Sequence, residues 1–312
     1  AALVLFTFGG DLDDYFGVGR VSAAIKNNSK KLLPHLGIQT IAGSGAHLTK
    51  YSNITDTAKS QKKLIIDEAV IPDLSIFDYS VTYNTPIGIT SDGALDGFTH
   101  LIEVLYGLEG KPEFKKVSGI ASTGIELIVK YLPGVIDRPD DNIARNALCY
   151  GTDLGGYAIM IGGTNGAHLT SFSLVDILSH GRACAIMEPY YSVLFAPAIN
   201  DSLRLVGNIF KKYGYSRTDF NNISDRQLGL SVASAMIKFS KKIGLPTTLK
   251  EVEGFSKIHI ERALKAAKDP ALKSKLENMP IPLSPDMVDI YMKKVLESAA
   301  SGDLSIIENI QG

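Results

Sequence analysis

The chain has 312 residues, 45% hydrophobic and 21% charged, a composition typical of a globular protein with one large or two medium domains. Its 32 basic and 33 acidic side chains nearly balance, and its lysine pairs are scattered, which argues against a nucleic-acid-binding surface. No apolar run approaches the roughly 20 residues that span a bilayer, so no membrane segment is expected. Cys149 and Cys184 are expected to be buried thiols in a reducing cytoplasm.

Residues 1–82 have the pattern of a mixed α/β segment. The apolar stretch Ala1–Phe8 is expected to be the end of a buried helix, and an acidic loop follows it. Short apolar runs bounded by Gly, Pro, Asn or Asp then predict strands. These runs are Gly37–Ala42, Tyr51–Thr55, Leu64–Ile66 and Leu74–Phe77.

Helical periodicity dominates from about residue 83 to the end of the chain, with turn signals between the segments. The expected helices are Thr85–Tyr106, Glu113–Leu132, Asp140–Met160, Gly166–Ile177, Gly181–Phe195, Ile199–Tyr213, Ser224–Ile243, Lys257–Lys268 and Ser284–Ser298. Asp140 is the expected N-cap of its helix, and Ser284 with Pro285 offers a cap and a first-turn proline to the last one.

The six histidines include one that follows an aspartate by four residues in a predicted helix, Asp96 and His100. That spacing places both side chains on one helix face, where they can hold one metal ion. Chance also produces such pairs, and Asp176 and His180 form a second example. Spacing alone therefore leaves metal binding open.

A Gly-rich break at Gly162–Gly166 precedes His168, and Gly181 follows His180 at an expected helix start. Lone histidines on apolar faces are often core residues. One aspartate and three histidines can also form a four-ligand site for Fe²⁺, Zn²⁺, Co²⁺ or Ni²⁺. Upstream, the Gly-, Ser- and Thr-rich loop Thr40–Thr49 follows a predicted strand and could cradle phosphate, although it matches no Walker or dinucleotide fingerprint.

The order and spacing of these segments resemble the iron-containing (group III) alcohol dehydrogenases. The family's Thr-Thr-Ala-Gly-Thr-Gly-Ser-Glu-x-Thr loop is similar to Thr40–Thr49, and its Asp-Ala-Leu-x-His-x-x-Glu helix is similar to Asp96–Glu103. Its His-x-x-x-His-x-Leu and His-Gly-x-Ala-x-Ala motifs are similar to His168–Leu174 and His180–Ala185. The match runs from about residue 9 to the C-terminus.

The resemblance implies an α/β remnant of a Rossmann-like nucleotide-binding domain over residues 1–82. An all-α metal-binding, catalytic domain over residues 83–312 follows, as in the dehydroquinate synthase-like architecture of this family. The implied metal ligands are Asp96, His100, His168 and His180. The residues implied to face NAD or NADP are Thr40, Ser44, Thr49, Lys62 and Thr82.

Three departures from the family pattern bear on mechanism. The second histidine of the family's His-x-x-x-His pair, which lies near substrate, is Phe172 here, and the spacing from His168 to His180 is about two residues shorter than usual. Ile41, Ala46 and His47 replace the usual Thr, Ser and Glu. The family also begins with a Gly-Gly-Gly-Ser phosphate loop, and the resemblance implies that this chain starts after it.

The implied function is a metal-dependent, NAD(P)-linked interconversion of a small alcohol and its aldehyde or ketone, with Fe²⁺ or Zn²⁺ as Lewis acid. We expect a small alcohol or aldehyde as substrate, no nucleic acid or membrane as partner, and a cytoplasmic location; a homo-oligomer is left open. Alternatives are a glycerol dehydrogenase or dehydroquinate synthase-like relative, a truncated metal-binding fragment without activity, and a structural helical domain whose histidines are core residues.

Overall fold

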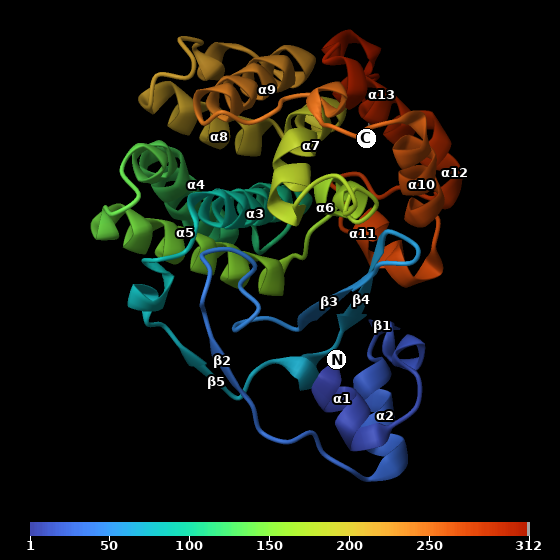
Figure 1. Ribbon diagram of the computed structural model, residues 1–312. Helices are drawn as coiled ribbons and strands as arrows, with labels where there is room; N and C mark the ends of the chain where they lie inside the picture. The colour runs from blue at the N-terminus through green and yellow to red at the C-terminus, as the bar shows by residue number, and fades with distance from the viewer. Residues whose placement is uncertain (311–312) are drawn as a thin grey trace.

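A small α/β lobe forms the first part of the chain in the computed structural model, which describes residues 1–310 (Figure 1). Its helices are α1 (Ala2–Phe8) and α2 (Arg20–Asn28), and its strands are β1 (Gly17–Val18), β2 (Leu36–Ile38), β3 (Tyr51–Asp56), β4 (Gln61–Ile66) and β5 (Leu74–Ile76). One sheet has the order β1-β4-β3, with β1 parallel and β3 antiparallel to β4. β2 and β5 pair in parallel as a separate two-stranded ribbon.

Strand β4 lies between two hydrophobic cores because successive side chains of a strand point to opposite faces. Ile65 packs into a small core with Val4, Tyr15 and Val21 under α1 and α2. Leu64 and Ile66, the residues on either side of Ile65, point to the opposite face of the strand and join the large core of the helical part. β4 therefore fixes the small lobe against the helices.

The rest of the chain is helical and surrounds α3, which lies at the centre in Figure 1. The helices are α3 (Ile87–Leu108), α4 (Phe114–Asp137), α5 (Asn142–Ile161), α6 (Gly166–Ser171), α7 (His180–Leu194), α8 (Asn200–Lys212), α9 (Asp225–Lys242), α10 (Lys257–Ala267), α11 (Lys273–Glu277), α12 (Pro285–Met287) and α13 (Lys293–Ser301). A π-helical segment, Val288–Met292, joins α12 to α13.

Helix α3 is the central element because its sequence is mostly apolar or small around the helix, apart from the polar face of Asp96, His100 and Glu103, a pattern typical of an enclosed helix. Every residue from Ala94 to Leu108 is buried. α4, α5 and α7 pack directly on it. Small residues allow the close approach, since a Cβ at Gly97 would lie 2.7 Å from the Thr152 methyl group on α5.

Helix α4 contains an apolar stretch of mean hydropathy 1.3, so by length and composition alone it could cross a membrane. No membrane segment was expected from the sequence. The helix packs against α3 and α5. Its side chains Val117, Ile125 and Leu132 are fully buried in the large core. These contacts are those of a core helix in a globular fold.

Several expected boundaries differ from the structure. α6 ends at Ser171 rather than at Ile177, and α5 is capped by Asp141, whose carboxylate accepts from the Ala144 N–H, rather than by Asp140. α1 is a helix as expected, but it is not buried: only Val4 is enclosed, and Phe6 is 79% exposed. α2 and α11 were not predicted. The domain boundary at residue 82 stays a prediction that falls between β5 and α3.

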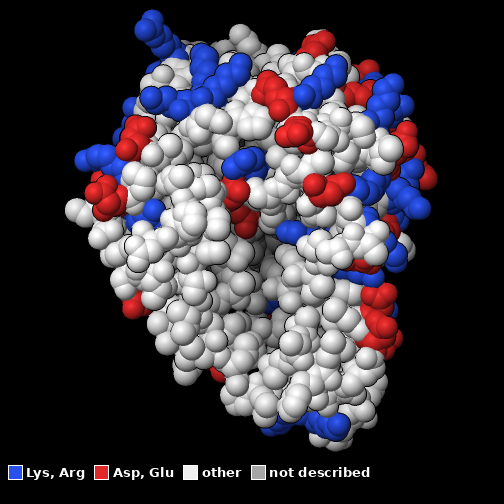
Figure 2. Space-filling model, viewed as in Figure 1, with Lys and Arg blue, Asp and Glu red and all other residues white. Residues whose placement is uncertain are grey.

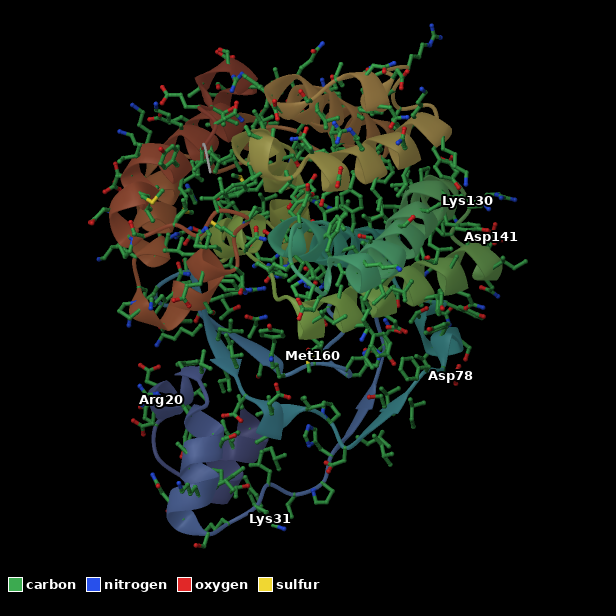
Figure 3. All side chains as sticks on the ribbon, turned by 180° about the vertical axis from the view of Figure 1, so that it is seen from behind. Arg20, Lys31, Asp78, Lys130, Asp141 and Met160 are labelled. Atoms are coloured by element: carbon green, nitrogen blue, oxygen red, sulfur yellow. The ribbon has the colours of Figure 1, made fainter. Side chains whose placement is uncertain are left out.

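The reverse side of the molecule shows the same division (Figure 3). Arg20 and Lys31 lie on the small lobe, whereas Lys130 and Asp141 lie at the outer end of the helical part. Met160, near the end of α5, lies at the border between the two parts. A cavity close to this border contains the candidate site.

Candidate active site

The candidate site is a cavity of about 320 Å³ between the strands β3 and β4 and the helices α3, α6, α7 and α11. Figure 2 shows a deep hollow on the face of the molecule seen in Figure 1, with basic and acidic side chains interspersed above it. The cavity is lined by Ser44, Ala46, Thr49, Tyr51, Ser52, Asn53, Lys62, Leu64, Asp96, His100, Ile159, Thr164, His168, Phe172, His180 and Lys275.

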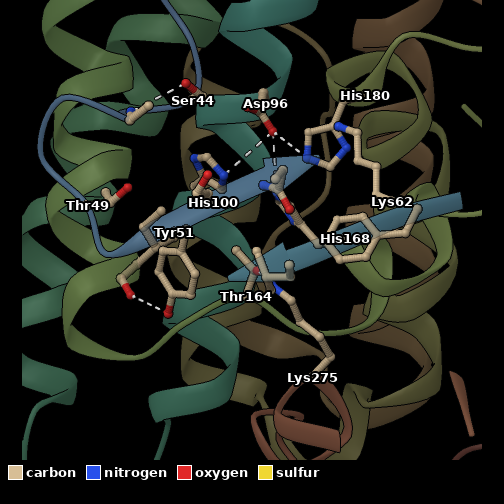
Figure 4. Close-up of a pocket in the computed structure, with 16 residues that line it drawn as sticks. Ser44, Thr49, Tyr51, Lys62, Asp96, His100, Thr164, His168, His180 and Lys275 are labelled. Carbon is tan, nitrogen blue, oxygen red and sulfur yellow. Dashed lines mark hydrogen bonds and ion pairs between the residues drawn. The ribbon is translucent and has the colours of Figure 1, made fainter. Parts of the chain in front are cut away.

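Three imidazoles converge on one carboxylate oxygen at the inner wall of this cavity (Figure 4). The Asp96 Oδ1 atom lies 3.3 Å from His168 Nε2, 3.5 Å from His180 Nε2 and 3.6 Å from His100 Nε2. Asp96 and His100 come from α3, His168 from α6 and His180 from the start of α7. The structure thus brings together all four residues that the resemblance implied as metal ligands.

Local sequence explains how the three helices can approach so closely. Asp96 and His100 are one turn apart on α3, so both face the same side. A Cβ at Gly181 would collide with the backbone oxygen of Asp92, so only glycine allows α7 to begin against α3. Asn165 caps α6 by accepting a hydrogen bond from the Gly166 N–H, which fixes the turn that carries His168.

Hydrogen-bond partners determine which ring nitrogen of His168 and of His180 faces the centre, whereas the Nδ1 atom of His100 has no partner among the described residues. His168 Nδ1 lies 2.6 Å from Glu103 Oε2, and His180 Nδ1 lies 2.9 Å from the Ser171 hydroxyl. A neutral ring that donates through Nδ1 leaves a lone pair on Nε2. When both rings are neutral, both Nε2 atoms therefore present lone pairs toward the Asp96 carboxylate, an arrangement that is repulsive unless a cation or a proton lies between them.

The pKa values of the cluster follow from burial and from these neighbours. Burial lowers the pKa of His100 to about 4 and that of His180 well below its usual value. Burial alone would raise the pKa of Asp96, but the three rings lower it below its usual range. Burial opposes a charged His168, yet Cys184, Glu103 and Asp96 raise its pKa. The donor set of one carboxylate and three imidazoles thus fits a divalent metal ion.

Glu103 on α3 contacts His168 at Nδ1, whereas the Nε2 atom of the same ring faces Asp96. Glu103 is 1% exposed, and it also accepts hydrogen bonds from the backbone N–H groups of Asn165, Ala167 and His168. Burial would raise its pKa, but His168, the Asn165 N–H and the charge of Lys275 lower it, so Glu103 is a carboxylate. One buried side chain therefore both orients a ligand ring and holds the first turn of α6.

Comparison with known proteins supports the interpretation of this geometry. The family model for the C-terminal part of the Fe-containing alcohol dehydrogenase family matches residues 90–295, and the iron-containing alcohol dehydrogenase model matches residues 1–79. The chain belongs to the iron-containing alcohol dehydrogenase family. The resemblance and the fold class inferred from the sequence are thereby confirmed.

Individual relatives agree with this assignment. The NAD-dependent methanol dehydrogenase of Bacillus methanolicus is 27% identical over 253 residues, which are 78% of this chain and 60% of that enzyme. The alcohol dehydrogenase of Oenococcus oeni has the same fold, with a TM-score of 0.76, 22% identity, and coverage of 96% of this chain and 72% of that one.

The sulfoacetaldehyde reductase of Bifidobacterium kashiwanohense, solved in complex with NAD⁺, has a TM-score of 0.66 and 25% identity, and the match covers 88% of this chain and 66% of that one. The chain spans about 60% of the length of the curated methanol dehydrogenase it matches.

The residues expected to face the dinucleotide fall into two groups in this family member. Ser44, Thr49 and Lys62 line the cavity. Thr40 and Thr82 do not: the carbonyl of Thr40 accepts from the Thr85 hydroxyl, and the buried Thr82 hydroxyl donates to the Tyr79 carbonyl. The cofactor role of all five stays a prediction.

His47, which replaces the family's glutamate in the loop, is not in the cavity. Its Nε2 lies 3.3 Å from Asp153 Oδ1 in a buried pair between the loop and α5. Asp153 also accepts a hydrogen bond of 2.7 Å from the Tyr79 hydroxyl. The substitution therefore attaches the loop to α5 rather than adding a group to the site.

Two site residues were missed in the sequence. Cys184 was expected to be a plain buried thiol; it is buried, but its sulfur lies with ligand atoms of Asp96, His168 and His180 within 4.8 Å of one another. Lys275 lies on α11, which was not predicted, and lines the cavity. The buried side chains Leu272, Leu276 and Met279 have the spacing of an apolar helix face. Lys275 lies within this apolar pattern, and a lysine at such a position was the signal in the sequence that could have identified it.

Phe172 occupies the position of the family's second histidine and is buried, with its ring centroid 5.8 Å from that of His180. The chain turns sharply after it, because Arg262 on α10 donates to the Ser173 carbonyl and to the Asp176 carboxylate. Asp176 also lies 3.4 Å from His259. Asp176 and His180 are four residues apart, but they therefore do not form a metal-binding pair.

Proposed function

We propose that this chain carries the metal site of a dehydrogenase that interconverts a small alcohol and its aldehyde or ketone with NAD(H) or NADP(H). The observation that supports the proposal is the convergence of three imidazole Nε2 atoms on Asp96 Oδ1 at 3.3 to 3.6 Å inside a cavity. Membership of the iron-containing alcohol dehydrogenase family supplies the reaction class. Fe²⁺ and Zn²⁺ both accept this donor set.

Asp96, His100, His168 and His180 would hold the metal ion, which, when bound, polarises a substrate oxygen while the nicotinamide exchanges a hydride. Asp96 supplies the negative charge that retains a dication in this buried place. Glu103 and Ser171 orient the rings of His168 and His180 through their Nδ1 atoms. Such supporting residues fix both the tautomer and the direction of a ligand lone pair.

The cavity favours small substrates. Its volume of about 320 Å³ is at the lower end of the range for small-molecule sites. Leu64, Ile159 and Phe172 provide apolar walls for a carbon chain, whereas Ser44 and Thr49 lie on the loop side. A low-polarity wall next to the charged cluster strengthens electrostatic interactions with a reacting oxygen.

Phe172 has no group that can carry a proton, so it cannot relay the proton of the reacting hydroxyl, and we propose that this proton leaves through water or a cofactor hydroxyl. A Phe172→His variant is expected to add a titratable ring close to His180 and to change the pH profile of kcat. Steady-state rates between pH 6 and pH 9 test this. An unchanged rate and an unchanged pH profile would show that no proton relay is missing at this position.

The first test is elemental analysis of the purified, metal-reconstituted chain, together with a NADH titration of the same sample. We expect about one metal ion per chain, and loss of the ion in a His168→Ala/His180→Ala double variant. His35→Ala is the matched control, because His35 contacts Asp73 and the Val70 carbonyl in the small lobe.

The outcomes of this test distinguish the possible roles of the site. Metal with NADH binding supports the dehydrogenase. Metal without NADH binding would restrict this chain to a metal-binding role. A folded chain that takes up no metal would reject the assignment of all four ligands.

A further inference from the structure

Lys275 is a buried cation at the cavity wall. Its residue is 4% exposed, yet it lines the same cavity as the metal ligands. Among residues 1–310, its ammonium group contacts the Thr164 hydroxyl and lies over the rings of Phe172 and Tyr51, 5.6 Å and 5.7 Å from their centroids. No carboxylate of this described part of the chain forms an ion pair with it.

A buried ammonium without an anionic partner is unusual, because buried charges in proteins are normally paired. Burial lowers the pKa of Lys275 to about 8, so the group still carries its charge at neutral pH. The carboxylates of Asp96 and Glu103 are directed at the histidines instead. A second lysine, Lys62, also lines the cavity. Asp96 and Glu103 act on the Lys275 ammonium only through space, so neither carboxylate occupies the position of a direct ion-pair partner.

The surroundings hold the ammonium in place without competing for it. The Thr164 hydroxyl and the two ring faces stabilise a cation through a hydrogen bond and through cation–π contacts. The Phe172 ring is the one that replaces the family's histidine, and a cationic imidazole there would repel Lys275. Figure 4 shows Lys275 approaching Thr164 from the side of the cavity opposite Asp96. A ligand can thus contact the two ends at once.

We propose that Lys275 binds an acidic group at the far end of the substrate, so that this site selects alcohols and aldehydes that carry a carboxylate or a sulfonate. The proposal rests on the proposed function for the reacting end of the molecule. The hydroxyl or carbonyl oxygen lies at the metal ligands, and the acid group lies at the Lys275 ammonium. The dinucleotide also carries anionic groups, so the test must distinguish the two sources.

Isothermal titration calorimetry of the Zn²⁺-loaded chain tests the proposal without requiring turnover. The probes are 4-hydroxybutanoate and 1-butanol, which share a carbon chain length and differ in the acid group. We expect the acid to bind about tenfold or more tightly than the alcohol, since only the acid can form a charge-assisted hydrogen bond with the ammonium. In Lys275→Met the ratio of the two affinities is expected to fall to about one.

Lys273→Met is the matched control, because Lys273 lies on the same helix with its side chain 70% exposed and paired with Glu277. It removes one positive charge outside the cavity and should leave the affinity ratio unchanged. Zn²⁺ content and thermal unfolding of Lys275→Met show whether the variant is folded and loaded. Lys275→Arg retains the charge and should keep most of the preference for the acid.

Three results would overturn the proposal. The first is equal affinity of the wild-type chain for both probes. The second is a preference for the acid that survives in Lys275→Met, which would mean that the metal ion or Lys62 binds the carboxylate. The third is a loss of NADH affinity in Lys275→Met with an unchanged preference for the acid, which would assign Lys275 to the dinucleotide.

Reduction of 4-oxobutanoate and of butanal with NADH, measured in parallel, separates this proposal from the proposed function. Lys275-dependent binding without reduction of either aldehyde would reject the dehydrogenase and keep the anion site. Reduction of both aldehydes with equal kcat/KM would keep the dehydrogenase and reject the anion site.

Discussion

Glu103 connects His168, a proposed metal ligand, to the fold. Because it accepts from His168 Nδ1 at 2.6 Å and from three backbone N–H groups, no neutral side chain can replace all of its bonds. Glu103→Gln is expected to weaken metal affinity about 10- to 100-fold, as loss of a ligand-orienting partner typically does. Competition with a chelator of known affinity measures this change.

Glu126→Gln provides the control for Glu103→Gln. Glu126 contacts Lys212 and Tyr213 near the surface of the helical part, away from the cavity. It should leave metal affinity unchanged. Equal affinities of the Glu103→Gln and wild-type chains would show that the ring of His168 is held by packing alone.

The buried Lys275 gives the stability of the ligand-free chain a distinct pH dependence. Burial lowers its pKa from 10.5 to about 8. Between these values the unfolded chain binds more protons than the folded chain, so the stability contributed at this position rises with pH. From pH 7 to pH 10 the wild-type chain should gain about 2–3 kcal/mol relative to Lys275→Met.

Urea unfolding of both proteins at both pH values measures this difference. Groups that titrate alike in the two proteins cancel in the comparison. A difference that does not change with pH would mean that the ammonium is already solvated or paired. This outcome would also remove one support of the anion site.

The four expected metal ligands came from a resemblance of motifs, and the structure places them together. Spacing alone could not have selected them, since Asp176 and His180 have the same separation as Asp96 and His100 but point to different partners. Cys184 and Lys275 could not be assigned to the site from sequence, because only the packing of α7 and α11 brings them to it.

At the scale of elements, the approach of α7 to α3 determines whether His180 reaches Asp96. A Cβ at Gly181 would collide with the backbone oxygen of Asp92, so Gly181→Ala must separate the two helices. We expect a loss of about 1–3 kcal/mol in the free energy of unfolding, in the range of overpacked sites. Metal affinity should fall as well, because the ligand set is spread over both helices.

Gly119→Ala is the control for this change. Gly119 is an exposed residue of α4, and a Cβ there meets no atom within 4 Å. Because alanine favours the helix over glycine, this variant should be more stable by about 0.5–1 kcal/mol. If Gly181→Ala bound metal as well as Gly119→Ala, the site would tolerate a displacement of α7.

The long helices were predictable because their apolar periodicity extends over several turns; α3, α4 and α5 lie where the sequence placed them, apart from their ends. Short elements depend on tertiary contacts. α6 stops at Ser171 because Arg262, distant in sequence, holds the following turn. β2 is Leu36–Ile38, so it includes only Gly37 and Ile38 of the expected strand Gly37–Ala42, since β5 offers three residues as partners.

At the scale of the whole molecule, two cores of very different size meet at β4. Four buried residues, Val4, Tyr15, Val21 and Ile65, form the small one, whereas the large one extends through the helical part. Because stability scales with buried apolar surface, the small lobe should open more readily than the helices. The four proposed metal ligands all belong to the helical part, so metal binding should stabilise that part selectively.

Native-state hydrogen exchange, with and without Zn²⁺, tests this division of the molecule. Amides of α2 should exchange at least about tenfold faster than those of α3, since local opening exposes only the small core. Zn²⁺ at about 100 times its Kd should raise the opening free energy of α3, α6 and α7 by about 2.7 kcal/mol and leave α2 unchanged. Equal protection of α2 and α3, rising together with metal, would instead mean that β4 couples both cores into one cooperative unit. In that case a metal ion at Asp96 would stabilise the small lobe as strongly as the helices that hold the ion.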